Sequence, residues 1–150
     1  MDKSRWFDVD KARLVLECLR MRQAYPGFLP KIVDNQLAWE GEIRETLPGI
    51  DAPPFRVRLL YPPAYPIRPP RIMPLSPELP EEHWGHRWHR WREGAICIVE
   101  PSRWEPSYTA ADALGKAADW YYNYLAYVNG LVKEMPDVGR VKIAESAGES

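Results

Sequence analysis

The sequence contains little cysteine, and this scarcity excludes one group of folds. Only Cys18 and Cys97 occur among its 150 residues. Two cysteines cannot build the disulfide framework of a small secreted domain or a cysteine-rich metal cluster. The chain begins MDKSR and does not lead into the apolar core of a signal peptide. These absences favour a protein of the reducing cytoplasm.

Long apolar runs and a charge imbalance are also missing. No stretch approaches the roughly 20 apolar residues of a membrane-spanning helix. Lys and Arg number 20 against 21 Asp and Glu, so the net charge of −1 gives no bulk attraction to nucleic acid. Apolar residues make up 45% and charged residues 27%, which is ordinary for a globular protein. We expect one domain over residues 1–150, with a flexible tail over about 138–150.

Two segments have helical periodicity. Over about residues 8–24 the apolar side chains fall at i, i+3, i+4 and i+7, and they predict an amphipathic helix with a core-facing stripe of Ala12, Val15, Leu16 and Leu19. Cys18 lies at the edge of that stripe and is expected to pack as a small hydrophobe. The second helix follows Thr109, a good N-cap, and ends at Asn129-Gly130.

Between the helices the pattern changes to strands. Residues 31–33 and 37–39 flank a turn at Asp34-Asn35-Gln36, and Phe55, Val57, Leu59 and Tyr61 alternate with arginines. Residues 61–80 contain eight prolines and are expected to form rigid extended chain, with a short edge strand at 71–73. The order of helix, antiparallel meander, irregular segment and helix predicts an α+β domain.

Histidine and cysteine gather in the irregular segment, where His83, His86, His89 and Cys97 lie within fifteen residues. Three chemistries are open on these residue types. They could bind zinc, although no C-x-x-C or H-x-x-x-H pair is present. Cys97 could be the nucleophile of a hydrolase with a histidine base. Cys97 could also carry an acyl group as a thioester, which needs positioning and oxyanion donors rather than acid–base machinery. The remaining alternative is that Cys97 is a small core residue without a chemical role.

Three motifs in order favour the acyl carrier. They are the proline-rich segment YPPAYPIRPP at residues 61–70, GAICI at residues 94–98, and WEPSYT at residues 104–109. Together they resemble the ubiquitin-conjugating enzymes, whose active-site pattern is G-x-[IL]-C-[IL] and whose W-x-P-x-x-T segment leads into the central helix. The resemblance extends over roughly residues 8–128. It implies that fold, with four antiparallel strands and a shortened C-terminus, and it makes Cys97 the thioester-forming nucleophile.

The departures from the family pattern concern the residues around the cysteine. The family usually has His-Pro-Asn, with the Asn eight residues before the cysteine, and here Arg87-Trp88-His89 stands at those positions. His89 could donate an N–H to the oxyanion, or it could only brace the loop. Glu100 and Asp112 are candidates to orient an acceptor lysine, or are surface charges. Trp104, with Trp88 and Trp91, is expected to cover the active-site loop and position the substrate.

The replaced Asn, the tryptophan-rich flanks and the short C-terminus resemble a bacterial branch of the family found in antiphage operons. These include cyclic-oligonucleotide signalling (CBASS) systems and ubiquitin-like conjugation systems. The resemblance implies a donor with a flexible C-terminal tail, either a ubiquitin-like protein or the CBASS nucleotidyltransferase. It also implies a separate activating enzyme, an acceptor lysine and no cofactor. A non-catalytic binding module with the same fold and a cysteine hydrolase remain the alternatives.

Overall fold

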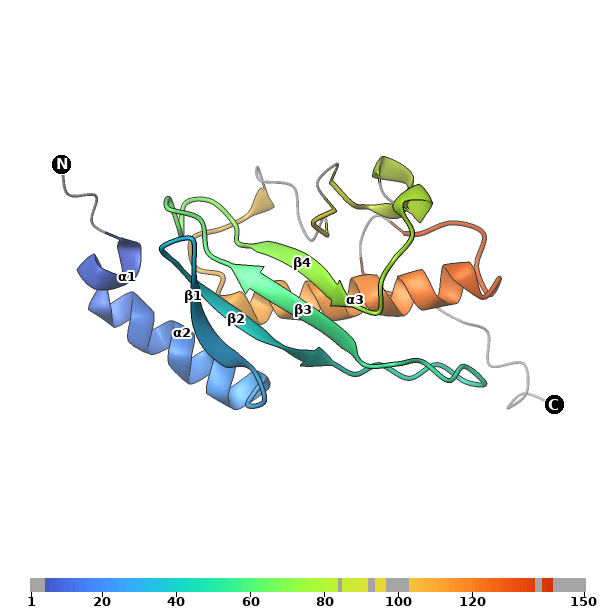
Figure 1. Ribbon diagram of the computed structural model, residues 1–150, viewed down its shortest axis with the longest axis horizontal. Helices are drawn as coiled ribbons and strands as arrows, with labels where there is room; N and C mark the ends of the chain where they lie inside the picture. Colours follow the sequence, from blue (N-terminus) through green and yellow to red (C-terminus); the bar gives the residue numbers. More distant parts are fainter. Residues whose placement is uncertain (1–4, 84, 92–93, 97–102, 137–138, 142–150) are drawn as a thin grey trace.

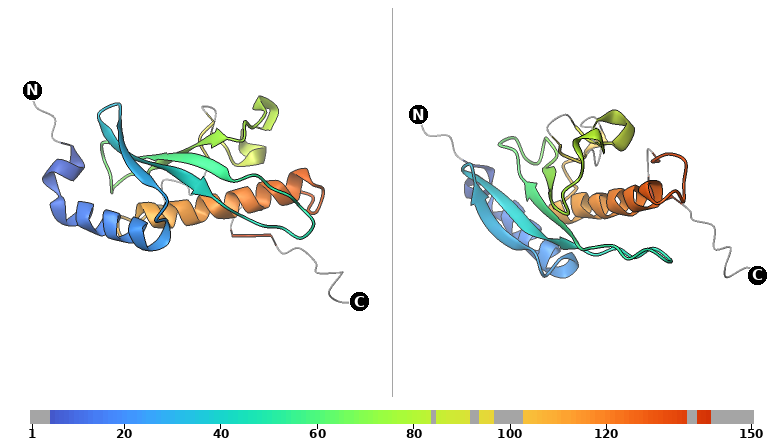
Figure 2. Two further views of the ribbon diagram at one scale, coloured as in Figure 1. Left: turned by 60° about the horizontal axis from the view of Figure 1, so that its bottom comes forward. Right: turned by 45° about the vertical axis from the view of Figure 1, so that its right-hand side comes forward.

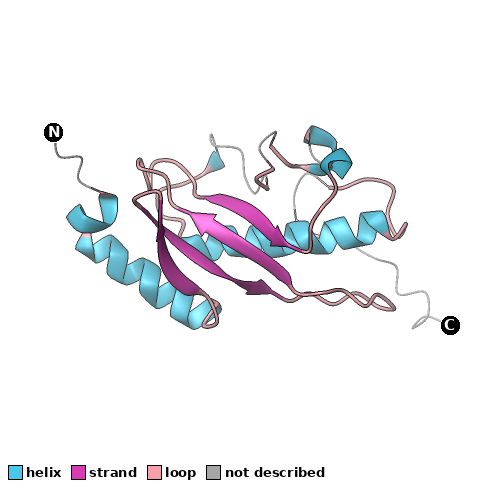
Figure 3. Cartoon of the chain, viewed as in Figure 1, coloured by secondary structure: helices cyan, strands magenta, loops and turns pink. Residues whose placement is uncertain are grey.

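The computed structural model describes residues 5–83, 85–91, 94–96, 103–136 and 139–141. Its elements, in chain order, are α1 (Trp6–Val9), α2 (Lys11–Ala24), β1 (Leu29–Val33), β2 (Gln36–Ile43), β3 (Phe55–Leu60), β4 (Arg71–Ser76), the 3-10 turns η1 (Glu81–His83) and η2 (His86–Trp88), and α3 (Ala110–Val128). The strands form one antiparallel sheet in the order β1-β2-β3-β4. The predicted α+β meander is confirmed (Figures 1 and 3).

The tight turn between β1 and β2 explains the register of the first hairpin. Asp34 and Asn35 both have positive φ, 50° and 64°, which is the geometry of a two-residue turn whose twist matches the strands. Val33 therefore pairs with Gln36, and the register continues to Leu29 opposite Glu40. This turn lies at the place where the Asx-rich sequence predicted it.

The long helix α3 runs across one face of the sheet, and the core lies between them (Figure 2). Phe55 stacks on Tyr121 at a ring-centroid distance of 4.3 Å. The β3 residues Val57 and Leu59 are fully buried, as is Tyr61 just after the strand. Thr109 caps α3 through its side chain, and the apolar stripe of this helix is buried: Leu114, Ala117, Ala118, Tyr121 and Leu125. The prediction for this helix is confirmed.

The first helical segment differs from its prediction in two ways. The chain forms α1 and α2 instead of one helix, and the Asp10 side chain caps α2 by accepting from the Arg13 backbone N–H at 3.0 Å. The predicted core-facing stripe is wrong for Ala12, Val15 and Leu19, which are exposed, and Leu16 is only half-buried. Glu17 and Met21 are buried in their place, so the helix is rotated relative to its apolar periodicity.

The chain after α3 returns along the helix. Asn123 donates to the Gly139 carbonyl and accepts from the Val141 backbone N–H, at 2.7 and 2.8 Å. Arg140 pairs with Glu45 at 2.5 Å and with Asp119 at 2.7 Å. Residues 139–141 are thus tied to α3, and the rest of the expected tail, residues 138 and 142–150, lies outside the described residues. None of the described helices has the length and apolarity needed to cross a bilayer.

Candidate active site

The segment that leads into Cys97 is attached to the edge of the sheet. Ile96 donates its backbone N–H to the Ile72 carbonyl of β4 at 2.8 Å. Ile96 also forms an isolated antiparallel bridge with Arg90, and Trp91 donates its backbone N–H to the Ala95 carbonyl at 2.8 Å. Ala95 and Ile96 are buried. The residue immediately before Cys97 in the sequence therefore has a fixed place on β4.

The segment from Trp104 to Thr109 is attached to the proline-rich loop and to α3. Trp104 is buried, and its indole Nε1 donates to the Pro66 carbonyl at 2.9 Å. Its ring meets Tyr108 edge-on at 5.2 Å and lies 6.3 Å from the Tyr65 ring. Two of the three sequence motifs thus contact each other through these side chains.

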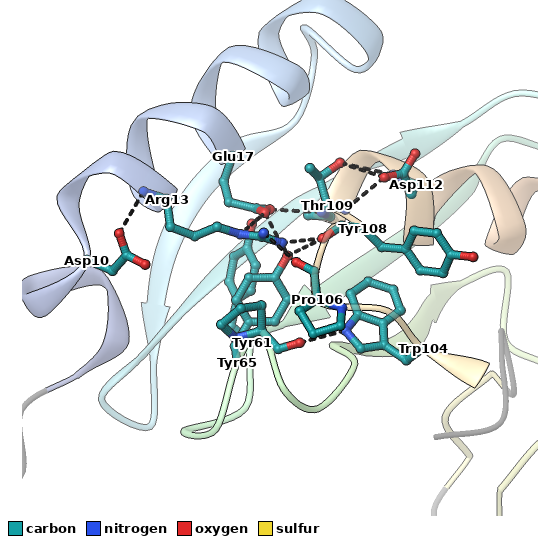
Figure 4. Close-up of polar contacts among 12 residues, drawn as sticks. Asp10, Arg13, Glu17, Tyr61, Tyr65, Trp104, Pro106, Tyr108, Thr109 and Asp112 are labelled. Atoms are coloured by element: carbon teal, nitrogen blue, oxygen red, sulfur yellow. Dashed lines mark hydrogen bonds and ion pairs between the residues drawn. The ribbon is translucent and has the colours of Figure 1, made fainter. Parts of the chain in front are cut away.

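A buried carboxylate joins these elements to α2 (Figure 4). Glu17 is fully buried, and its oxygens accept hydrogen bonds from Tyr61 Oη at 2.8 Å, Tyr65 Oη at 2.7 Å and the Ala110 backbone N–H at 2.8 Å. The last donor is the first residue of α3, whose N-terminal end favours a negative charge. Satisfying a buried carboxylate in this way requires partners from several elements at once.

Arg13 completes this group, which we call the Glu17 network and which consists of Arg13, Glu17, Tyr61, Tyr65 and Ala110. Arg13 Nε lies 2.9 Å from Glu17 Oε2. The same guanidinium donates to Tyr65 Oη at 2.9 Å, to the Pro106 carbonyl at 2.6 Å and to the Tyr108 carbonyl. The network therefore holds the proline-rich loop, the Trp104–Thr109 segment and the start of α3 together.

Burial and the Glu17 charge both raise the pKa of the two tyrosines. Desolvation, and then the neighbouring carboxylate, raise the pKa of Tyr61 well above its ordinary value. The same two causes raise the pKa of Tyr65, although Arg13 acts in the opposite direction. Both phenols remain protonated donors to Glu17 over the whole neutral range.

His89 contacts the chain beyond the C-terminal end of α3, whereas the Glu17 network contacts the first residue of that helix. The backbone φ of His89 is +54°, which a non-glycine residue rarely adopts. The half-buried ring brings Nε2 to 3.4 Å from the Met135 carbonyl, in the chain that follows α3. A nitrogen facing a carbonyl oxygen must carry hydrogen. This contact joins the loop to the chain that follows α3.

The neighbouring tryptophan also packs on α3. Trp88 stacks on His83 at 4.0 Å and lies 4.8 Å from the Tyr127 ring, and its carbonyl accepts from Trp120 Nε1 at 2.9 Å. His83 Nδ1 is 2.7 Å from Tyr124 Oη. The tryptophan expected to cover the loop therefore joins it to α3, while Trp91 is largely exposed.

The remaining predicted site residues fall into two groups. Cys97 and Glu100 lie outside the described residues. Asp112 is exposed on the first turn of α3, where Oδ2 accepts from the Thr109 backbone N–H at 2.8 Å and from its hydroxyl at 3.2 Å. The structure therefore brings Trp104 and Asp112 to the two ends of one short segment, and His89 contacts neither among the hydrogen bonds of the described residues.

Sequence reasoning missed three charged residues that organise this region, namely Arg13, Glu17 and Arg90. Arg13 and Glu17 are four residues apart on a helix, a spacing that forms ion pairs, but neither belongs to the apolar stripe from which the core-facing side was predicted. Arg90 is also four residues from its partner, Gly94. Gly94 is the first residue of the GAICI motif and has a φ of +96°. Glycine adopts positive φ readily, so its presence there could have suggested this turn.

The zinc alternative is tested only in part. Among the described residues no three His, Cys, Asp or Glu side chains are close enough together to hold a metal ion. His83 and His89 instead contact Tyr124 and Met135. The side chain of His86 and all of Cys97 lie outside the described part of the chain, so the full four-residue set is not described.

Fold and motifs together define an E2-like domain, the fold of the ubiquitin-conjugating enzymes (E2). Four features carry this assignment: the N-terminal helix, the four-stranded meander, the cysteine segment on the edge of β4 and the helix after WEPSYT. A comparison with protein families matches residues 17–130 to E2-CBASS, the type II CBASS E2 protein. The chain belongs to this family, and so has an E2-like role in CBASS defence. A search of curated proteins found no match.

Proposed function

We propose that this protein carries an acyl group on Cys97. In the first step the Cys97 thiolate attacks the activated carbonyl carbon of a donor protein's C-terminus, and the bond between that carbon and its leaving group breaks. In the second step a lysine amine attacks the thioester carbonyl. An amide forms, the amine loses a proton, and the Cys97 thiolate leaves.

The observation that carries this proposal is the position of Ile96. Its hydrogen bond to Ile72 docks the chain on β4 one residue before the cysteine. Acyl transfer through a thioester depends more on holding the reacting atoms in place than on a strong base. A rigid approach to the nucleophile is what such a reaction requires.

The histidine contacts favour the carrier over the hydrolase. A hydrolase would use a histidine near the cysteine sulfur as its general base. His83 Nδ1 faces Tyr124 Oη, and Nε2 of His89 faces the Met135 carbonyl. Both rings join the loop to α3 or to the chain beyond it, which suits a structural role.

Each remaining candidate has a proposed task. His89 braces the loop through Met135, and it could reach an oxyanion only through Nδ1, which donates when the ring is charged. Trp104 fixes the segment after the cysteine to Pro66. Glu100 and Asp112 are the acidic candidates to orient an acceptor lysine.

Membership of the family suggests the partners. We propose that the donor is the C-terminal tail of a ubiquitin-like protein or of the CBASS nucleotidyltransferase. A separate activating enzyme, or a donor that is already activated, supplies the high-energy acyl group. No cofactor is required for either step. The site would act in the cytoplasm.

The test is a trapping experiment with Cys97→Ser expressed beside the genomic neighbours. Serine forms an oxygen ester that an amine attacks more slowly than a thioester, so an adduct accumulates. Intact-mass spectrometry should find a covalent partner on Cys97→Ser, and a wild-type adduct that is lost in reductant. Cys18→Ser is the matched control, and it should behave as wild type.

Two results would contradict the carrier. The first is the absence of any adduct on wild type and on Cys97→Ser. The second is unchanged partner binding by Cys97→Ala, with defence intact. Together these results would assign the protein to the alternative of a binding module with the same fold.

A further inference from the structure

Arg90 is a charged residue beside the β4 edge of the sheet, in a buried position where an apolar side chain is usual. It is 5% exposed, and burial lowers the pKa of its guanidinium from the ordinary value. Arginine stays charged in proteins even so. Burying this charge is costly, so the contacts it makes must contribute something that an apolar residue would not.

Two of its hydrogen bonds are directed at one backbone carbonyl. Arg90 Nε and Nη2 donate to the Gly94 oxygen at 2.9 and 2.7 Å. Gly94 has a φ of +96° and donates its own N–H to the Trp91 carbonyl at 2.9 Å. Two donors from one planar group fix the direction of the Gly94 carbonyl as well as its position.

The backbone of Arg90 reinforces the same geometry. Its N–H donates to the Gly85 carbonyl at 3.1 Å, and the residue is the bridge partner of Ile96. We call Arg90, Gly94 and Ile96 the Arg90 clamp. One residue thus holds the chain at its own position, at Gly94 and at Ile96, directly before Cys97.

We propose that Arg90 is a positioning residue for acyl transfer at Cys97. This inference rests on the proposed function. By fixing the Gly94 carbonyl and pairing with Ile96, Arg90 sets the geometry of the chain up to the residue before Cys97, and through it the Cys97 sulfur is presented to its substrate. The tetrahedral intermediate of acyl transfer needs the sulfur in place, because its oxyanion must meet its donors.

Two reagents that react with the Cys97 thiolate distinguish a change in the positioning of the sulfur from a change in its accessibility. The acetylglycine thioester of 2-mercaptoethanesulfonate transfers its acyl group through a tetrahedral oxyanion and releases the mercaptoethanesulfonate thiolate. Iodoacetamide alkylates the thiolate by displacing iodide, without any oxyanion. Peptide mass spectrometry reads both products at Cys97, with Cys18 as a reference in the same molecule.

The variants are Arg90→Met, which keeps the stem, and Arg90→Lys, which keeps the charge without the planar fork. Arg87→Met is the matched control, since Arg87 is exposed in the same loop. We expect Arg90→Met to slow acyl transfer to Cys97 about tenfold, with alkylation of Cys97 changed by less than about threefold. Arg90→Lys should lie between it and wild type, and Arg87→Met should match wild type.

Two results would overturn the inference. One is wild-type acyl transfer in Arg90→Met. The other is an equal change in acyl transfer and alkylation, or a parallel change at Cys18, because both indicate a general loosening of the fold. If wild-type Cys97 accepts no acyl group at all, the proposed function fails first. Amide hydrogen exchange at Ile96 then tests the clamp alone, and unchanged protection in Arg90→Met would refute it.

Discussion

The Nε atom of Arg13 lies 2.9 Å from Oε2 of Glu17, one turn along α2 and on the buried side of that helix. From this pair the Glu17 network extends to both segments that flank the active-site loop. Its carboxylate meets Tyr61 and Tyr65 on one side and the start of α3 on the other. The stability of the domain and the order of the site therefore depend on the same group.

Removing the Glu17 carboxylate should destabilise the protein strongly. Glu17→Ala leaves the Arg13 charge and two buried phenols without their partner, which costs about 3–5 kcal/mol in the free energy of unfolding. Glu17→Gln keeps the shape and one acceptor and should cost less. Urea unfolding followed by tryptophan fluorescence measures both.

The control for this prediction is Glu42→Gln, because Glu42 is an exposed carboxylate on β2. It should change the unfolding free energy by less than about 0.5 kcal/mol. A Glu17→Ala variant as stable as Glu42→Gln would show that the network contributes nothing to stability.

The raised pKa values of Tyr61 and Tyr65 predict a loss of stability in alkali. In the unfolded chain a tyrosine releases its proton near pH 10, whereas the folded protein retains it to a higher pH. Above about pH 10 the folded state therefore binds more protons, and its stability falls as the pH rises. Below that pH this contribution is fully present.

Urea titrations between pH 8 and pH 11 measure this slope. Tyr65→Phe should be less stable at pH 8, because the hydroxyl donor to Glu17 is lost, and its stability should fall less steeply above pH 10. Tyr127→Phe, outside the network, is the control. Identical slopes in wild type and Tyr65→Phe would contradict the prediction.

Asp112 has a structural contact that can be separated from its proposed catalytic task. Thr109→Ala and Asp112→Asn each remove part of the same capping box, so each should lower stability by about 1 kcal/mol. If Asp112 also orients the acceptor amine, Asp112→Asn should slow discharge of the Cys97 thioester to free lysine several-fold more than Thr109→Ala does. Equal discharge rates would leave Asp112 with the capping role alone.

The contribution of the hydrogen bond from Trp104 to Pro66 can be tested by a conservative substitution. Trp104→Phe keeps an aromatic ring on Tyr108 but loses the indole N–H, and we expect a loss of about 1 kcal/mol in stability together with slower acyl transfer to Cys97. The matched control is Trp91→Phe at an exposed ring. If acyl transfer to Cys97 is as fast in Trp104→Phe as in Trp91→Phe, the hydrogen bond to Pro66 does not contribute to the reaction.

The positive φ of His89 predicts which substitutions that position accepts. Asparagine enters the left-handed region more easily than alanine, and asparagine is also the usual residue of the family there. His89→Asn should therefore fold with little loss, while His89→Ala should lose about 1–2 kcal/mol from backbone strain and the lost contact with Met135. Thermal unfolding compares them, and equal losses would show that the backbone geometry is not limiting.

Much of the fold could be predicted because short sequence patterns specify its strands, its first turn and the start of its long helix. The alternation of Phe55, Val57 and Leu59 set the third strand, the Asp34-Asn35 turn set the first hairpin, and Thr109 set the start of α3. Each signal acts over a few residues of the chain. The three motifs around Cys97 identified the family for the same reason.

The buried face of α2 and the burial of Arg90 were decided only by the tertiary structure. Apolar periodicity places a glutamate or an arginine in water, because a lone buried charge is unfavourable. Glu17 is buried because its donors come from residues 44, 48 and 93 positions away, and no local window contains them. The sequence by itself determined the family and the place of Cys97 in its motif, whereas long-range packing determined which charged side chains hold the chain on either side of it.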